Sequence, residues 1–413
     1  MSASEIPLED MLAFEEEMWV EGVPHDFFRR LRNECPVHFT KEMRDFPEEP
    51  GFWSVVKADD LRTVSRDWET FSSEIGGIVA ATNGMPLELM QGMFIAMDPP
   101  KHDRLKALFQ RGFTPKRIAM HEDDIRAIVR DELDKLDGQE TCDVVHDIAQ
   151  PVVARVICSF MGIADEDVLM WSDLINKILA AGDPDINPDG LETIATRDMP
   201  IVFEKAHALV AARRENPTED LTSVLVHAEI DGDMLEEHEI VMGFFLLMAA
   251  GNDSTKSTFS SAVLALLENP DQKQKLLDNM NLVPSTVEEA LRMFPAFAHF
   301  RRTATKDTVI NGQEIKKGDK VVMWYVAAGR DEDEFENPDV FDVERNPTHQ
   351  SFGAGGRHFC LGAALARLEL KILLEETFAR YPKMQLNGKE TWVVSGFVNQ
   401  LKTLPVKLGP RAT

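Results

Sequence analysis

The loop "SFGAGGRHFCLG" at residues 351–362 combines groups that could do chemistry: a lone cysteine, a histidine and closely spaced glycines. It is not a dinucleotide-binding loop, because the third glycine of a GxGxxG fingerprint is missing. It is not a phosphate loop either, since no Lys-Ser/Thr pair follows. A zinc site would need more cysteine or histidine nearby than His349 and His358 provide. No base that could activate a nucleophilic cysteine is identifiable.

A thiolate at the start of a helix remains, because apolar residues at helical spacing follow Cys360. Backbone N–H groups in the first turn of a helix stabilise a thiolate. Glycines let the backbone approach a flat group closely. A lone cysteine is usually a buried structural residue, but the glycine-rich approach favours a metal ligand.

A second candidate lies within the apolar segment 238–268, which predicts a helix buried on nearly every side. The stretch "GNDSTKSTFSS" interrupts it with poor interior helix formers. One interpretation is two helices with a polar N-cap between them. The other is a single buried helix distorted over a reaction centre, with Asp253 and Ser254 as proton-relay groups. Small residues would leave the space for that centre: Ala249, Ala250 and Gly251.

A third feature is the pair Glu289 and Arg292, which share a face of the helix predicted within 285–297. Taken alone, this is an ordinary surface ion pair worth about a few tenths of a kcal/mol. Further along, the proline-punctuated segment 336–347 contains Arg345.

The elements that must position these residues are mainly helical. Helical periodicity covers residues 118–136, 143–162 and 195–215. The β-rich stretches are 36–62, 303–326 and 385–410, and Asn311-Gly312 marks a hairpin turn. Residues 76–96 are apolar but broken by glycine and proline, which predicts either core or a mobile wall over a pocket. No repeat or linker divides the chain, so we expect one domain over residues 1–413.

Composition excludes several classes of protein. The chain has 71 acidic and 44 basic residues and a net charge of -27, which argues against nucleic acid or an anionic membrane as partner. The four cysteines are far apart, which argues against a disulfide framework and fits a reducing cytoplasm. The N-terminus is acidic where a signal peptide would be basic, and no apolar run approaches about 20 residues. We expect a cytoplasmic monomer with no membrane span.

With these motifs in order along the chain, the sequence resembles the cytochrome P450 family, the haem-thiolate monooxygenases. The matching elements are "HDRLK" (102–106), "AGNDST" (250–255), Glu289-x-x-Arg292, "RTATKD" (302–307), Arg345 and the cysteine loop. The resemblance implies the P450 fold, mainly α with a small β-rich part. It places haem b between the helix at 238–268 and the helix that follows Cys360.

The resemblance also implies roles for individual residues. Cys360 would be the thiolate ligand to the haem iron, in a loop from Phe352 to Gly362. Four residues match the haem-propionate positions: His102, Lys106, Arg302 and His358. Asp253 and Ser254, followed by Thr255, match the acid–alcohol pair that delivers protons to dioxygen. Gly251 would lie where oxygen sits. Glu289, Arg292 and Arg345 resemble a structural triad that supports the haem loop.

Three departures from the family pattern have physical consequences. Ser254 stands where threonine is usual; it lacks the methyl group that limits rotamers, so we expect more leakage to peroxide. Lys106 stands where arginine is usual and cannot make a bidentate contact. Cys360 follows Phe352 by eight positions, one more than the common form, so we expect a local bulge.

The implied reaction inserts one atom of O2 into a C–H bond of an apolar small molecule, with electrons from a soluble ferredoxin and its reductase. The segments 51–77 and 395–408 look most like bacterial members that act on steroids, terpenoids or branched lipids. The expected pocket residues are Met248, Ala249, Ala250, Phe297, Phe397 and Val398, and segment 76–97 is expected as a further wall.

A basic patch for the electron donor is expected at Lys101, Arg104, Arg111, Lys116 and Arg357. Two other classes stay open at this point: a haem-thiolate peroxygenase, and a non-catalytic haem sensor or electron carrier. The acid–alcohol pair argues against both, and the large apolar pocket argues against the second.

Overall fold

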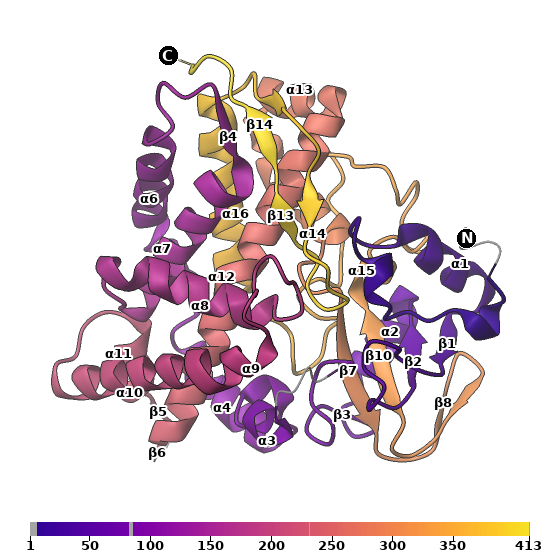
Figure 1. Ribbon diagram of the computed structural model, residues 1–413. Coiled ribbons are helices and arrows are strands. Elements are labelled where there is room, and N and C mark those ends of the chain that lie inside the picture. Colours follow the sequence, from indigo (N-terminus) through magenta and orange to yellow (C-terminus); the bar gives the residue numbers. More distant parts are fainter. Residues whose placement is uncertain (1–5, 82–85, 231, 413) are drawn as a thin grey trace.

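Most of the long helices lie on one side of the molecule, and the main sheet lies on the other with α1, α2 and α15 (Figure 1). The structure is a computed structural model that describes residues 6–81, 86–230 and 232–412. Its α-helices are α1 (His25–Glu34), α2 (Ala58–Arg66), α3 (Leu87–Gln91), α4 (Lys101–Gln110), α5 (Pro115–Ala119), α6 (Glu122–Asp134), α7 (Gln150–Met161), α8 (Val168–Leu179), α9 (Leu191–Thr193), α10 (Met199–Glu215), α11 (Leu221–Val226), α12 (Glu237–Glu268), α13 (Pro270–Asp278), α14 (Val283–Met293), α15 (Tyr325–Ala328) and α16 (Ala363–Arg380). The mainly helical expectation is confirmed.

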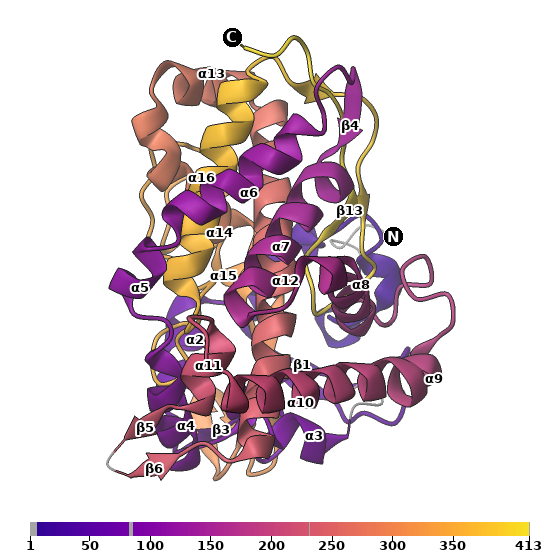
Figure 2. The same cartoon turned by 90° about the vertical axis from the view of Figure 1, so that its left-hand side faces the viewer.

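The long helix α12 is unbroken over 32 residues, so the alternative of two helices separated by a polar cap is wrong. The side chains of Glu236 and Glu239 form a capping box at its N-terminus. In both views α12 runs through the middle of the helical part (Figures 1 and 2). It contacts α7, α8, α10 and α16, and this close packing holds the polar stretch in helical form despite its poor propensity.

The main sheet has five strands in the order β1-β2-β10-β7-β3. Its strands are β1 (Val37–Thr40), β2 (Phe52–Val55), β3 (Phe71–Ser72), β7 (His299–Ala304) and β10 (Lys320–Trp324). The β2–β10 pairing is parallel and the others are antiparallel. The smaller strands are β4 (Thr141–Asp143), β5 (Glu229–Ile230), β6 (Asp233–Met234), β8 (Thr308–Ile310), β9 (Gln313–Ile315), β11 (Gln385–Leu386), β12 (Thr391–Trp392), β13 (Leu401–Thr403) and β14 (Pro405–Lys407).

The predicted turn at Asn311-Gly312 is confirmed: both residues have positive φ, 46° and 80°, between the paired strands β8 and β9. The boundaries of two β-rich stretches need correction. Residues 58–62 belong to α2, because the distant Asp331 carboxylate accepts a hydrogen bond from the Ala58 N–H at 2.9 Å and completes the helix start. Tyr325, assigned to the β-rich part, begins the short helix α15.

One apolar helical stretch, Val144–Met161, is long and apolar enough to cross a membrane by length and composition. Its mean hydropathy is 1.3, and 67% of it is buried inside the protein. It begins with a π-helical turn at Val144–Ala149 and continues as α7, which packs against α12, α6 and α8. These contacts account for its apolar surface as core.

Candidate active site

The cysteine loop turns on three glycines in the left-handed region, Gly353, Gly355 and Gly356, with φ of 94°, 89° and 87°. A Cβ on Gly356 would lie 2.8 Å from the Ser65 carbonyl oxygen, so this position also needs glycine for space. Ser65 Oγ donates to the Gly355 carbonyl at 2.7 Å. Gly355 and Gly356 thus lie against the end of α2, and the expected bulge stays a prediction.

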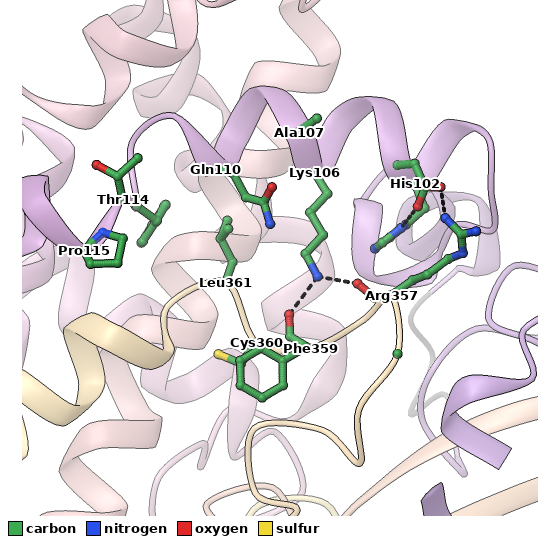
Figure 3. Close-up of a pocket in the computed structure, with 13 residues that line it drawn as sticks. His102, Lys106, Ala107, Gln110, Thr114, Pro115, Arg357, Phe359, Cys360 and Leu361 are labelled. Atoms are coloured by element: carbon green, nitrogen blue, oxygen red, sulfur yellow. Dashed lines mark hydrogen bonds and ion pairs between the residues drawn. The ribbon is translucent and has the colours of Figure 1, made fainter. Parts of the chain in front are cut away.

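Cys360 lies just before α16, as the sequence predicts. Its N–H donates to the Phe352 carbonyl at 2.8 Å, and the N–H groups of Gly362 and Ala363 donate to its sulfur. Protein atoms crowd the thiol and raise the pKa of Cys360, while these N–H groups and the charge of Lys106 act in the opposite direction. The side chain opens onto a cavity of about 640 Å³ between α4 and the loop (Figure 3). The two N–H groups are therefore placed to stabilise a thiolate once an incoming group binds the sulfur.

The predicted propionate-binding residues converge around His358. Its ring centroid lies 4.1 Å from that of His102. Burial lowers the pKa of His358, and the nearby charges of Arg302, His102 and Lys106 lower it further. Among the described residues, the buried Arg302 has no ion pair and one hydrogen bond, from Nη1 to the Arg301 carbonyl at 2.7 Å. Buried cations without anions are unstable, so the cluster fits a group that carries carboxylates.

Lys106 and Arg357 are placed differently from the rest of that cluster. Lys106 Nζ donates to the Phe359 carbonyl at 2.8 Å and also to the Arg357 carbonyl, which ties α4 to the cysteine loop (Figure 3). The Arg357 guanidinium pairs with Asp103 and lies over the Trp68 ring, 5.4 Å from its centroid. Arg357 thus faces the surface, and the propionate role of Lys106 stays a prediction.

Asp253 belongs to a buried polar cluster that the sequence did not predict. Its Oδ1 lies 2.6 Å from Lys256 Nζ, with the two side chains 3% and 2% exposed. Asn252 Nδ2 donates to the same oxygen at 3.0 Å, and Lys256 Nζ also donates to Asn176 Oδ1 of α8 at 3.0 Å. Asp253 Oδ2 is buried and has no hydrogen-bond partner among the described residues. A lysine three residues after an acid in an apolar helix was the signal for this pair.

The alcohols of the same stretch have partners of their own. Ser254 Oγ donates to the Ala250 carbonyl at 2.7 Å. Thr255 donates to Glu369 of α16, whose pKa burial raises to about 8. Gly251 packs on α7, where a Cβ would lie 2.7 Å from Ile157 Cδ1, and this contact explains the glycine. The proton-relay and oxygen-site roles of these residues stay predictions.

The predicted triad is assembled. Arg292 donates from Nε and Nη2 to the two carboxylate oxygens of Glu289, both at 2.7 Å, and both side chains are fully buried. Arg345 Nε donates to Glu289 Oε1 at 3.0 Å. Arg292 Nη1 also donates to the carbonyls of Gly329 and Pro338, at 2.7 and 2.8 Å. The pair is therefore a buried junction between α14 and the 329–345 segment, as the family resemblance implied.

A second cavity, of about 630 Å³, has a largely apolar lining. Ala249, Ala250, Phe297 and Phe397 line it, as predicted. Two other predicted lining residues do not. Met248 is fully buried and precedes Ala249 by one position on α12, so its side chain leaves the helix on a different face from that of Ala249. Val398 directly follows Phe397, so the two side chains point to opposite sides of the chain, and Val398 forms an isolated β-bridge with Phe297.

The described part of segment 76–97 forms one wall of this apolar pocket, from Ile78 to Ile95. Sequence reasoning missed two further walls, the N-terminal Phe14 and Glu16 and the stretch 178–203. His299 also lines the pocket, and its ring accepts from the Ala80 N–H at 3.0 Å and contacts the Gly396 carbonyl at 2.8 Å.

The basic patch is only partly free. Three of its members are paired, Lys101 with Glu74, Arg104 with Asp233 and Glu239, and Arg357 with Asp103. Arg111 and Lys116 are exposed and have no ion pair within the described part of the chain. These two lie beside the cysteine-loop cavity that Thr114 and Pro115 line.

Comparison with known proteins identifies the family. The family model "Cytochrome P450" matches residues 197–393. A Mycobacterium marinum cytochrome P450 in complex with pseudoionone has 33% sequence identity and a TM-score of 0.90, covering 97% of this chain and 99% of that one. The chain belongs to the cytochrome P450 family.

Two further relatives agree. The methyl-branched lipid omega-hydroxylase of Mycobacterium tuberculosis is 36% identical over 97% of this chain and 95% of its own length. A Bacillus megaterium structure in complex with testosterone is 30% identical, with a TM-score of 0.80 and coverage of 94% and 99% of the two chains. The predicted fold is confirmed. Members of this family bind haem b, and this P450 is a monooxygenase.

Proposed function

We propose that this P450 hydroxylates an apolar steroid, terpenoid or branched lipid, with electrons from a soluble ferredoxin. The observation that carries the proposal is Cys360, whose sulfur receives two backbone N–H groups at the start of α16. Hydrogen bonds to a thiolate favour its charged form and tune it as an iron ligand. Residues 1–413 would act as one domain and as a monomer in the cytoplasm.

The residues present fit haem b. Cys360 would bind the iron, and Arg302, His102 and His358 would hold the propionates through charge-assisted hydrogen bonds. The buried Arg302, which has no ion pair among the described residues, would gain its missing anion there. When bound, haem supplies the activation of dioxygen, and the protein supplies position and protons.

Asp253 is the best-placed proton-handling group on α12. Lys256 holds one oxygen of its carboxylate at 2.6 Å, which fixes the side chain and stabilises its charge. The other oxygen has no partner in the described residues and can accept or give a proton. We assign Ser254 and Thr255 to the same relay. Ser254 Oγ, which donates to the Ala250 carbonyl, would supply one alcohol of that relay.

The apolar pocket supports the substrate class. Ala249 and Ala250 leave room beside α12, while Phe297 and Phe397 provide flat apolar surface with ring centroids 5.2 Å apart. Pseudoionone and testosterone, bound by two structural relatives, are largely apolar molecules of a size that such a lining suits. The third relative acts on methyl-branched lipids.

The test is turnover with a terpenoid ketone, a steroid and a branched alkane, with a soluble ferredoxin and its reductase supplied. The proposal expects an oxygenated product from at least one class, with product formed in proportion to reducing equivalents consumed. Turnover that requires added peroxide and ignores the reductase would support a peroxygenase instead. Replacing the exposed Arg111 and Lys116 by glutamine should slow reduction by the ferredoxin without changing substrate binding.

A further inference from the structure

The apolar pocket contains carboxylates but no cation. Its charged lining residues are Glu16 and Glu192, and in the described ranges no lysine or arginine lines it. The remaining residues, 1–5, 82–85, 231 and 413, contain no lysine or arginine either. A ligand in this pocket would therefore meet negative charge only.

Glu16 is the first residue of a 3₁₀ turn, Glu16–Met18, and has no ion pair among the described residues. Its carboxylate faces the Gly182 loop, where a Cβ built on Gly182 would lie 3.6 Å from Oε1. The Glu16 N–H donates to Asp45 Oδ2 at 2.8 Å, which brings a second negative charge nearby. Burial raises the pKa of Glu16, and Asp45 raises it further, as expected for a carboxylate without a cation.

The basic residues near the other wall are already paired. Arg197, five residues after Glu192, lies 2.7 Å from Asp198 and 3.1 Å from Asp189. Lys402 lies 2.9 Å from Asp183 and 2.6 Å from Asp185, on the loop that follows α8. Neither cation lines the pocket, so they leave its charge uncompensated.

The other polar lining groups do not supply positive charge. Burial lowers the pKa of His299 to about 3, so its ring is neutral, and both ring nitrogens are already in hydrogen bonds. Ser395 Oγ accepts from the N–H groups of Phe397 and Val398, at 3.1 and 3.2 Å. Among these lining side chains, the Ser395 hydroxyl hydrogen is the one neutral donor without a hydrogen-bond partner in the described residues.

We propose that this pocket selects apolar molecules whose polar end is a neutral hydrogen-bond donor, such as a hydroxyl, and rejects carboxylates. A hydroxyl can donate to Glu16 or Glu192, whereas a carboxylate would be desolvated beside like charges with no cation to hold it. The inference rests on the proposed function only for placing the substrate in this pocket. It predicts that sterol- or terpenol-like compounds bind and that free fatty acids are excluded.

The test compares two ligands with the same branched hydrocarbon chain, one ending in a primary alcohol and the other in a carboxylate. Isothermal titration calorimetry of the holoenzyme at about pH 7.5, where the acid is ionised, should show the acid binding at least about tenfold more weakly. In the variant Glu16→Gln/Glu192→Gln, the dissociation constant of the acid should exceed that of the alcohol by less than about threefold. The control Glu17→Gln/Glu204→Gln makes the same change of net charge at exposed neighbours outside the pocket and should keep the tenfold ratio.

Equal affinities for alcohol and acid in the natural protein would overturn the inference. So would a preference that survives in the double variant, because Glu16 and Glu192 would then not cause it. Failure of the proposed function would look different: the alcohol would bind in the calorimeter but yield no oxygenated product on turnover.

Discussion

Replacing Lys256 by methionine should isolate Asp253 as a buried charge. Methionine keeps most of the length and apolar stem of lysine but removes the cation 2.6 Å from Asp253 Oδ1. At an effective dielectric of about 20, two unit charges at that distance attract by about 6 kcal/mol. Desolvation of the lysine offsets part of this, so the net loss on removing one partner is about 3–5 kcal/mol.

Urea denaturation of the natural protein, Lys256→Met, Asp253→Asn and the double variant gives the pair energy as a double-mutant cycle. We expect the double variant to recover most of the loss, because it removes both charges. Lys177→Met is the matched control, since Lys177 lies 2.6 Å from Asp173 in a more exposed pair, with side chains 25% and 60% exposed. That control should cost at most about 1 kcal/mol. A loss below about 1 kcal/mol for Lys256→Met, or a double variant no more stable than the single one, would refute the reasoning.

Three further predictions concern the haem pocket and its helices. The folded-state pKa of Glu369, about 8 against an ordinary 4.5, makes its contribution to stability complete below about pH 4.5 and lost as pH rises toward 8. In Glu369→Gln, the free energy of unfolding measured in urea should therefore fall less steeply between pH 5 and 9 than in the natural protein, and at pH 9 the variant should be more stable by roughly 3–5 kcal/mol. An unchanged pH dependence would contradict this. Arg302→Gln should speed haem transfer to an apo-globin acceptor at least about tenfold, while the exposed Arg111→Gln should leave it unchanged; equal rates would remove Arg302 from the propionate site. Ser254→Ala should change stability by less than about 0.5 kcal/mol and raise the share of reducing equivalents recovered as peroxide; unchanged coupling would assign the relay to Thr255 or water.

Residues whose partners are local, or belong to a recognisable set, were predictable from the sequence. Glu289 and Arg292 share a helix face at i, i+3, and Asn311-Gly312 has the composition of a hairpin turn. The placement of Cys360 before a helix followed from the glycines before it and the apolar periodicity after it. These features depend on short stretches of chain, where backbone geometry limits the possibilities.

The remaining features depend on contacts between distant segments. The Asp253–Lys256 pair was visible as a spacing, but its burial depends on Asn176 of α8, which is 80 residues away from Lys256. Met248 does not line the pocket, and predicting this requires knowing which face of α12 meets the pocket. A helix that is apolar on nearly every side gives no sequence signal for that face. Glu16 enters the pocket from an N-terminal segment that carries no motif. Tertiary packing decided each of these cases.

The most direct test of the central claim, that Cys360 is the thiolate ligand of the haem, is a carbon monoxide difference spectrum of the reduced holoenzyme. Cys360→Ser is the test variant. Cys35→Ser is the control, since Cys35 is half-buried after α1 and far from the cysteine loop in sequence. We predict the red-shifted band of thiolate-ligated haem in the natural protein and in Cys35→Ser, and its loss in Cys360→Ser. Absence of that band from the natural protein, or its persistence in Cys360→Ser, would contradict the account.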